Sequence, residues 1–169
     1  MFHEMRRKAQ QMSLADCTVV LKRCTAGVLA LYGDDGYPYA VPISYVYDGR
    51  QLCFHSAIEG HKIEAIKHCG QASFCVIDQD QIVPEKYTTL YRSVIVFGQI
   101  ALVEENKEKR QLIEKLAIKY APTDTVQRRT QAIDKEWERL CVLKMSIEHL
   151  SGKEAMGIVR SRQAHAGQL

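Results

Sequence analysis

The stretch that decides the fold is Ser93-Val94-Ile95-Val96-Phe97-Gly98-Gln99-Ile100-Ala101-Leu102-Val103. Its first half is apolar at consecutive positions, which is typical of a β-strand that is covered on both faces. Gly98 interrupts the run, and a glycine inside a strand indicates a bulge or the corner of a barrel. A lone small barrel covers only one face of such a strand, so the segment also predicts a dimer.

Turn signals divide the rest of the chain into short strands. Gly33-Asp34-Asp35-Gly36 and Asp48-Gly49 have the residue types of hairpin turns. Residues 141–150 alternate between apolar and polar side chains, as in a half-buried strand. The six strands expected are residues 26–32, 39–47, 51–56, 72–77, 93–103 and 141–150. Polar residues 78–91 are expected to be irregular, and residues 151–154 to form a turn.

Helices are expected between the strands, where apolar side chains recur at helical spacing. The expected helices are residues 14–24, capped by Ser13, and residues 61–68, 107–120 and 126–140. Strand and helix do not alternate regularly, which favours a barrel over a doubly wound parallel sheet. We therefore expect a β-rich α+β fold, a six-stranded antiparallel barrel with peripheral helices.

The length of 169 residues fits one domain. We expect a basic arm at residues 1–12, the barrel domain at residues 13–158 and a flexible tail at residues 159–169. Lys and Arg exceed Asp and Glu by 23 − 20 = 3, too small an excess for a dedicated nucleic-acid-binding protein. The sequence shows neither an apolar run of about 18 residues nor a secretory signal, so a cytoplasmic protein without a membrane partner is expected.

Metal binding and cysteine chemistry have little support in the sequence. The six cysteines contain no C-x-x-C pair, and we expect reduced, mostly buried thiols. His55, His61 and His68 lack the additional ligands of a metal site, so no metal is expected.

The densest group of chemically capable residues is Phe54-His55-Ser56-Ala57-Ile58-Glu59-Gly60-His61-Lys62. A strand end supplies the imidazole of His55 and the hydroxyl of Ser56, and a helix begins after Gly60. Free N–H groups at the helix start, together with the Lys62 ammonium, suit a phosphate. An ordinary surface loop with a helix cap is the alternative.

A second candidate segment is Tyr39-Ala40-Val41-Pro42-Ile43-Ser44-Tyr45-Val46-Tyr47. Pro42 cannot donate a backbone hydrogen bond, so this strand is expected to lie at a sheet edge or to be bulged. Its backbone beside Pro42 would suit the polar edge of a flat ring. The alternative is an edge strand with half-buried tyrosines.

Taken in order, these segments resemble the flavin-binding split-barrel superfamily typified by pyridoxamine 5′-phosphate oxidase, and within it the nitroimidazole-resistance branch. The matching segments are residues 27–30, 37–45, 54–57 with 60–62, 91–98 and 151–154. The resemblance implies an FMN-binding split barrel that forms a homodimer with two shared flavin sites. FAD is the alternative flavin, and NADH or NADPH is the implied electron donor.

The resemblance also assigns site residues by position. Pro42, Ile43 and Ser44 would face the flavin ring through their backbone, and His55, Ser56 and Ala57 would lie beside the ring and its chain. Gly60, His61 and Lys62 would meet the phosphate, although the oxidases carry Arg-Lys where this chain has His61-Lys62. Tyr91, Arg92, Ser93 and Val94 would approach from the other subunit.

The implied activity is reduction of a small nitroaromatic or nitroimidazole ring, with His55 as the catalytic residue. The chain lacks the Arg-Leu-x-Pro ending of true pyridoxamine phosphate oxidases, so vitamin B6 phosphate is not the expected substrate. The alternatives are a flavin-binding or drug-sequestering protein without turnover, and a split barrel that uses haem or deazaflavin.

Overall fold

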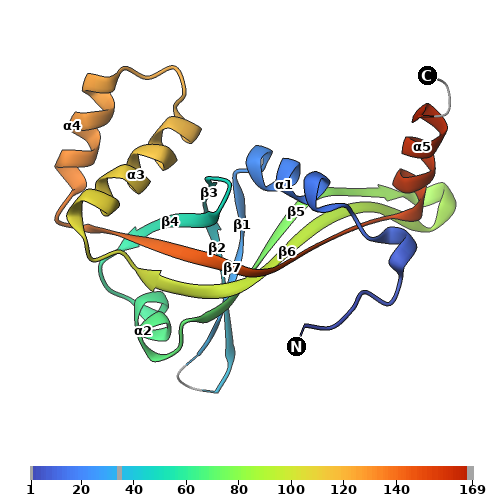
Figure 1. Ribbon diagram of the computed structural model, residues 1–169, viewed down its shortest axis with the longest axis horizontal. Helices are drawn as coiled ribbons and strands as arrows, with labels where there is room; N and C mark the ends of the chain where they lie inside the picture. Colours follow the sequence, from blue (N-terminus) through green and yellow to red (C-terminus); the bar gives the residue numbers. More distant parts are fainter. Residues whose placement is uncertain (1, 34–35, 167–169) are drawn as a thin grey trace.

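A curved antiparallel sheet forms the centre of the computed structural model, which describes residues 2–33 and 36–166 (Figure 1). Within these ranges its seven strands are ordered β2-β1-β5-β6-β7-β4-β3. They are β1 (Ala26–Tyr32), β2 (Pro38–Ser44), β3 (Val46–Tyr47), β4 (Gln51–Ala57), β5 (Gln71–Val83), β6 (Thr88–Leu102) and β7 (Leu140–Glu154). The β-rich α+β fold is confirmed, and the expected count of six strands is wrong.

The additional strand arises because the strand expected at residues 39–47 divides at Tyr45. This residue is fully buried, and its N–H donates to the carbonyl oxygen of Thr25 at 3.2 Å. On one side of Tyr45, β2 pairs with β1; on the other, β3 pairs with β4. Residues 38–47 thus connect the two ends of the sheet order, which brings the ends of the sheet together.

The hairpin of β5 and β6 is longer than expected. Its pairing runs from Gln71 with Gln99 to Val83 with Thr88, so residues 78–91 are mostly strand rather than irregular. The register shifts between Phe97 and Gly98 in the pairing of β6 with β7, which confirms the predicted bulge. A Cβ at Gly98 would lie 1.7 Å from the carbonyl oxygen of Ser146, so only glycine fits there.

Helices cover the barrel and extend its ends. Within the described residues they are α1 (Leu14–Arg23), α2 (His61–His68), α3 (Asn106–Tyr120), α4 (Val126–Glu136) and α5 (Met156–Ala166), with short 3₁₀ turns η1 (Lys8–Gln10) and η2 (Pro84–Lys86). The Ser13 hydroxyl accepts from the N–H of Asp16, which confirms the predicted cap. Asp34 and Asp35 of the first expected hairpin turn lie outside the described residues.

The chain termini depart from expectation. Residues 159–166, expected in a flexible tail, continue helix α5, and residues 151–154, expected as a turn, complete β7. In the expected arm, Met12 is buried and its N–H donates to the carbonyl oxygen of Gly152 at 2.9 Å. Residues 167–169 lie outside the described part of the chain.

Charged side chains tie the termini to the long hairpin. Arg92 on β6 donates to buried Glu154 on β7 at 2.9 Å and contacts Asp78 on β5 at 3.3 Å. Asp78 also pairs with Arg23 of α1, and Arg162 of α5 pairs with Glu154. The resulting chain of ion pairs fixes α1 and α5 against β5, β6 and β7.

The described residues form two hydrophobic cores. The first fills the barrel around Tyr45, Phe54 and Phe74, whose rings meet edge to face. The second includes Leu116 and Ile133 and lies between α3, α4 and the outer side of β4 and β7. This second core holds α3 and α4 together beside the end of β4, where the two helices form a wall (Figure 1).

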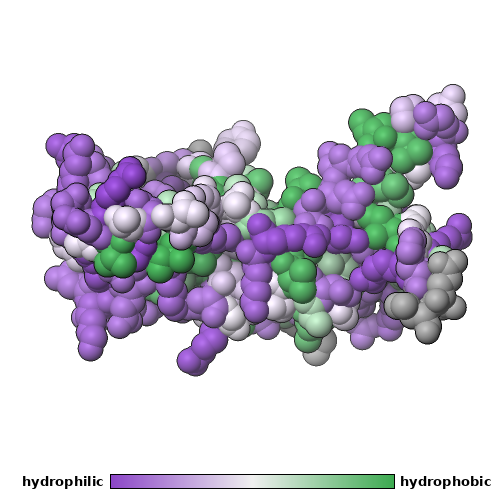
Figure 2. Space-filling model, turned by 90° about the horizontal axis from the view of Figure 1, so that it is seen from above, coloured by the Kyte–Doolittle hydropathy of each residue, from purple (hydrophilic) through white to green (hydrophobic). Residues whose placement is uncertain are grey.

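The outer surface is uneven in polarity. Figure 2 shows mainly hydrophilic residues at the end formed by α3 and α4, and a group of hydrophobic residues toward the end that carries α5. Among the residues described, none of the helices combines the length and apolarity needed to cross a membrane.

Candidate functional site

The turn from β4 into α2 brings the ammonium of Lys62 to the end of the strand. Gly60 adopts φ +117°, a conformation that favours glycine, and helix α2 begins at the next residue. Lys62 Nζ donates to Ser56 Oγ at 2.8 Å. Burial lowers the pKa of Lys62. A cation, a hydroxyl and a helix N-terminus therefore share one place, as the sequence predicts.

His61 lies on the β2 side of this turn. Its ring is 4.2 Å from the ring of Tyr39, measured between centroids, with the planes inclined by 30°. This contact connects the start of α2 to β2, the strand that contains Pro42. As predicted for a strand with a proline at this position, β2 lies at an end of the sheet order.

His55 precedes Ser56 at the end of β4, where it pairs with Val142 of β7. Partial burial lowers the pKa of its imidazole, and the positive charge of Lys62 lowers it further. A lowered pKa keeps the imidazole mainly neutral at pH 7. The neutral ring can accept a hydrogen bond at this pH, and the protonated form of His55 becomes more abundant in acid.

A cleft of about 740 Å³ brings several predicted residues together. Ser44 from the end of β2 and His55, Ser56 and Ala57 from the end of β4 line one side. The opposite wall comes from α3, α4 and the start of β7: Ile113, Leu116, Ala117, Tyr120, Ala121, Asp124, Arg129, Ala132, Ile133, Glu136, Arg139 and Leu140. Lys62 does not line the cleft, but it donates a hydrogen bond to Ser56, which does.

This second wall was not predicted from the sequence. The apolar spacing of Leu112, Ile113, Leu116 and Tyr120 identifies the buried face of a helix, but the spacing does not say which strand the face meets. Of the predicted ring-facing segment, Ile43 packs against the barrel core, while Pro42 is exposed. Of these three residues, Ser44 lines the cleft, whereas Pro42 and Ile43 do not.

Residues 91–94 do not reach this cleft within one chain. Ser93 pairs with Lys153, whereas the cleft lies at Leu140, the other end of β7. Leu140 and Lys153 are 13 positions apart on β7, which corresponds to about 43 Å measured along the strand. Arg92 is held by Glu154 and Asp78, and the side chain of Val94 is fully buried. Contact of residues 91–94 with the cleft therefore requires a second subunit and stays a prediction.

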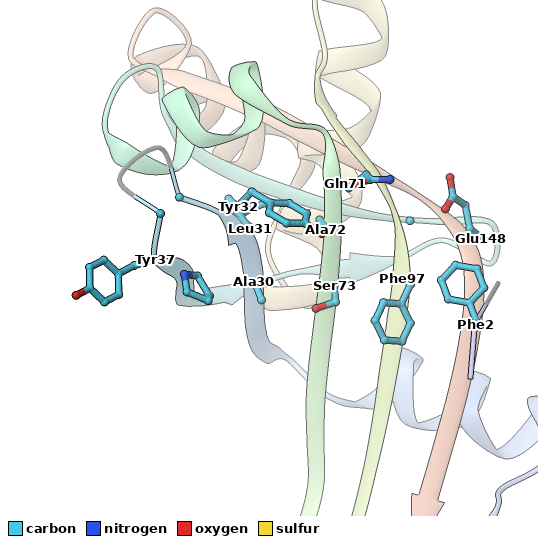
Figure 3. A pocket seen from close by; sticks show the side chains of 14 residues that line it. Phe2, Ala30, Leu31, Tyr32, Tyr37, Gln71, Ala72, Ser73, Phe97 and Glu148 are labelled. Carbon is cyan, nitrogen blue, oxygen red and sulfur yellow. The ribbon is translucent and has the colours of Figure 1, made fainter. Parts of the chain in front are cut away.

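A separate hollow of about 770 Å³ lies on the outward face of β1, β5 and β6 (Figure 3). Ala30, Ser73 and Phe97 lie side by side across these strands at its floor. Phe2 closes one side, with its ring 5.4 Å from that of Phe97 and stacked at 4.6 Å on His149. The predicted site residues do not line this hollow.

The sequence of the region that forms the barrel and the cleft matches a known family. The sequence model described as pyridoxamine 5′-phosphate oxidase matches residues 13–154. The chain belongs to the pyridoxamine 5′-phosphate oxidase family. In this family member the matched region includes the barrel, the cleft and both ends of the β5–β6 hairpin.

Solved structures share the fold of this pyridoxamine 5′-phosphate oxidase family member. A candidate 5-nitroimidazole antibiotic resistance protein from Bacteroides thetaiotaomicron is 20% identical, with a TM-score of 0.74 over 85% of this chain and 86% of that chain. A conserved hypothetical protein from Mycobacterium tuberculosis is 19% identical, with a TM-score of 0.76 over 89% and 90%. A FAD-binding protein from Mesorhizobium loti is 25% identical, with a TM-score of 0.64 over 86% and 97%. Comparison with curated proteins finds no match.

Proposed function

We propose that this chain is a flavin-dependent oxidoreductase that binds FMN in the cleft and reduces a small aromatic substrate of the nitroaromatic or nitroimidazole class. NADH or NADPH is the proposed electron donor. The observation that carries the proposal is the Lys62–Ser56 pair beside His55, at the edge of a cleft with apolar walls. Family membership and the fold shared with a FAD-binding protein support the same reading.

The donors at the start of α2 fit a flavin phosphate. The Lys62 ammonium and the Ser56 hydroxyl lie together, and the helix N-terminus adds a favourable dipole. A phosphate oxygen would replace Ser56 as the acceptor for Lys62. FMN supplies hydride transfer when it is bound.

The ring would lie across the end of β2. Pro42 and Ser44 belong to an edge strand, so backbone atoms on that side are available to the polar edge of a ring. Ser44 lines the cleft, and Leu116 and Ile133 lie opposite. These apolar side chains exclude water from one face of a flat substrate and favour an aromatic one.

His55 is the proposed source of the proton for the reduced substrate. Its imidazole lines the cleft and lies on the strand that carries Ser56, so a substrate beside the ring would be within reach. In the first two-electron reduction, which converts a nitro group to a nitroso group and water, protonated His55 would donate a proton to the nitro oxygen that leaves as water. Bound flavin would supply the two electrons, and solvent would supply the second proton and reprotonate His55. Because the pKa of His55 is lowered, only a minor fraction of the imidazole is protonated at pH 7, and the rate of this step should depend on pH.

A homodimer is proposed because the outward face of β5 and β6 is apolar. Val28, Cys75 and Ile95 lie in one row across β1, β5 and β6, and Ile95 is 36% exposed. Ile77 on the same hairpin is 63% exposed. A second copy of the chain packed on this face would bury the row of apolar side chains. In that dimer, residues 91–94 of each subunit would lie near the cleft of the other subunit.

The visible spectrum of the purified protein, followed by anaerobic addition of NADH or NADPH, tests the proposal. Flavin bands that bleach on addition would support an oxidoreductase. Flavin bands that persist with both donors would instead favour a flavin-binding protein without turnover. A Soret band would indicate that the protein binds haem instead of flavin. Failure of the protein to retain added FMN would contradict the proposed flavin site.

A further inference from the structure

The last residue of α3, Tyr120, is bonded to the point where β2 and β3 separate. Its hydroxyl oxygen accepts from the N–H of Tyr45 at 3.1 Å, and its hydroxyl donates to the carbonyl oxygen of Thr25. Tyr45 is the residue that divides the strand, and Thr25 directly precedes β1. One side chain therefore connects helix α3 to two backbone segments of the barrel.

The preceding residue strengthens this attachment. Lys119 Nζ donates to the carbonyl oxygen of Cys24 at 2.5 Å and lies 4.2 Å from the centroid of the Tyr45 ring. The Tyr45 hydroxyl in turn donates to the carbonyl oxygen of Leu21 at 2.9 Å. The C-terminal end of α3 is thus fixed to the end of α1, to the start of β1 and to Tyr45.

Tyr120 and Ser44 both line the cleft. Ser44 directly precedes Tyr45, so the Tyr120 hydroxyl holds the residue next to one side of the cleft while its own helix forms the other side. The N–H of Tyr45 keeps a second acceptor, the carbonyl oxygen of Thr25 at 3.2 Å. Loss of the Tyr120 hydroxyl would therefore leave that N–H with one acceptor instead of two and would remove one of the attachments of α3.

We propose that Tyr120 is a positioning residue whose hydroxyl sets the distance between the α3 wall and the backbone at Ser44. Through this distance it controls how closely a flat ring fits the cleft. The part of the proposal that concerns the ring rests on the proposed flavin site. The part that concerns the attachment of α3 depends only on the bonds described above.

Tyr120→Phe tests the hydroxyl while keeping the aromatic ring in the cleft. Tyr47→Phe is the matched control, because the Tyr47 hydroxyl also donates to a backbone carbonyl, that of Gly49 at 3.0 Å, away from the cleft. Amide hydrogen exchange of the protein without added flavin measures the attachment. Kd values for FMN and for riboflavin, measured by flavin fluorescence, report the fit of the ring.

In Tyr120→Phe the amide of Tyr45 should exchange about fivefold faster, and both flavins should bind about fivefold more weakly, since one hydrogen bond is lost. In Tyr47→Phe these quantities should match those of the parent protein. Parent-like exchange at Tyr45 and parent-like Kd values in Tyr120→Phe would overturn the proposal. If the parent protein binds neither flavin, the proposed function fails, and the exchange at Tyr45 alone decides the role of Tyr120.

Discussion

Lys62 Nζ lies 2.8 Å from Ser56 Oγ and so connects the first turn of α2 to the end of β4. Among the described residues no carboxylate lies within 4.0 Å of the ammonium, and the Ser56 hydroxyl that accepts its hydrogen bond is neutral. A cation held beside a helix N-terminus without a neutralising carboxylate is suited to an anionic ligand. Three predictions test the site that this arrangement supports, and a fourth tests the ion pairs that hold the chain ends.

Lys62→Ala should weaken FMN binding by roughly one to two orders of magnitude, because a charge-assisted contact is worth about 1.5–3 kcal/mol. Riboflavin lacks the phosphate, so its affinity should barely change. Titration calorimetry with both ligands measures the difference. Lys67→Ala, which removes an exposed lysine paired with Glu64 on the same helix, is the control. Equal losses for FMN and riboflavin would show that Lys62 does not meet the phosphate.

His55→Ala should slow turnover of a nitroaromatic by roughly 10²–10⁴-fold while leaving flavin binding nearly intact, because the variant lacks the proposed proton donor. Single-turnover reduction kinetics separate the proton-dependent step from flavin reduction. His68→Ala at the far end of α2 serves as the control. A variant that reduces the substrate at the parent rate would exclude His55 as the acid.

The rate of substrate reduction should rise as pH falls, because only protonated His55 donates. Burial and the charge of Lys62 place the pKa of His55 below its usual value of 6.5, so the rise continues below pH 6.5. The profile of kcat/KM between pH 5 and 8 measures the effect. In His55→Asn the profile should be flat in this range. An unchanged slope in that variant would assign the titration to another group.

Asp78→Ala should lower the free energy of unfolding by about 2–4 kcal/mol, since it leaves Arg92 without one partner and removes the attachment of Arg23. Burial opposes ionisation of Asp78, but its bonds to Arg23 and Arg92 outweigh this and hold its pKa below 3.8. A lowered carboxyl pKa stabilises the fold above pH 3.8, and this contribution is lost as pH falls through the folded-state pKa.

Denaturant unfolding at pH 7 and near pH 3 checks the Asp78 prediction. The difference between Asp78→Ala and the parent protein should shrink in acid. Asp80→Ala, an exposed carboxylate on the same strand, should behave as the parent at both pH values. A difference that is the same at both pH values would mean that packing, not the ion pairs, accounts for the loss.

The parts of the fold that could be predicted from the sequence are those in which a short segment contains the residue types that a cap, turn or bulge requires. The Ser13 cap and the turn at Gly60 depend on neighbouring residues, and a glycine within a strand is itself the sign of the bulge at Gly98; the structure has all three. Residues 78–91 were not recognised as strand, because a two-stranded ribbon leaves both of its faces open to polar side chains. Helix α5 is attached by Arg162 to Asp16, 146 positions earlier, which no local pattern reveals.

The cleft could be predicted only in part for a similar reason. Residues 54–62 carry their chemistry within nine positions, so the side formed by β4 and α2 is visible in the sequence. The opposite side depends on α3 docking through Tyr120 and Lys119 to residues about 95 positions earlier. These contacts join segments that are far apart in the sequence, so no local sequence pattern predicts them.

The position of β7 also determines when the protein can fold during its synthesis. This last strand lies between β6 and β4 in the sheet order, so before it is made the sheet consists of two separate parts, β2-β1-β5-β6 and β4-β3. Each part then presents an unpaired edge, at β6 and at β4, which can pair with another chain. The barrel can close only after residues 140–146, which pair with β4 and include residues that also pair with β6, have left the ribosome, and until then these edges are open to pairing with other chains.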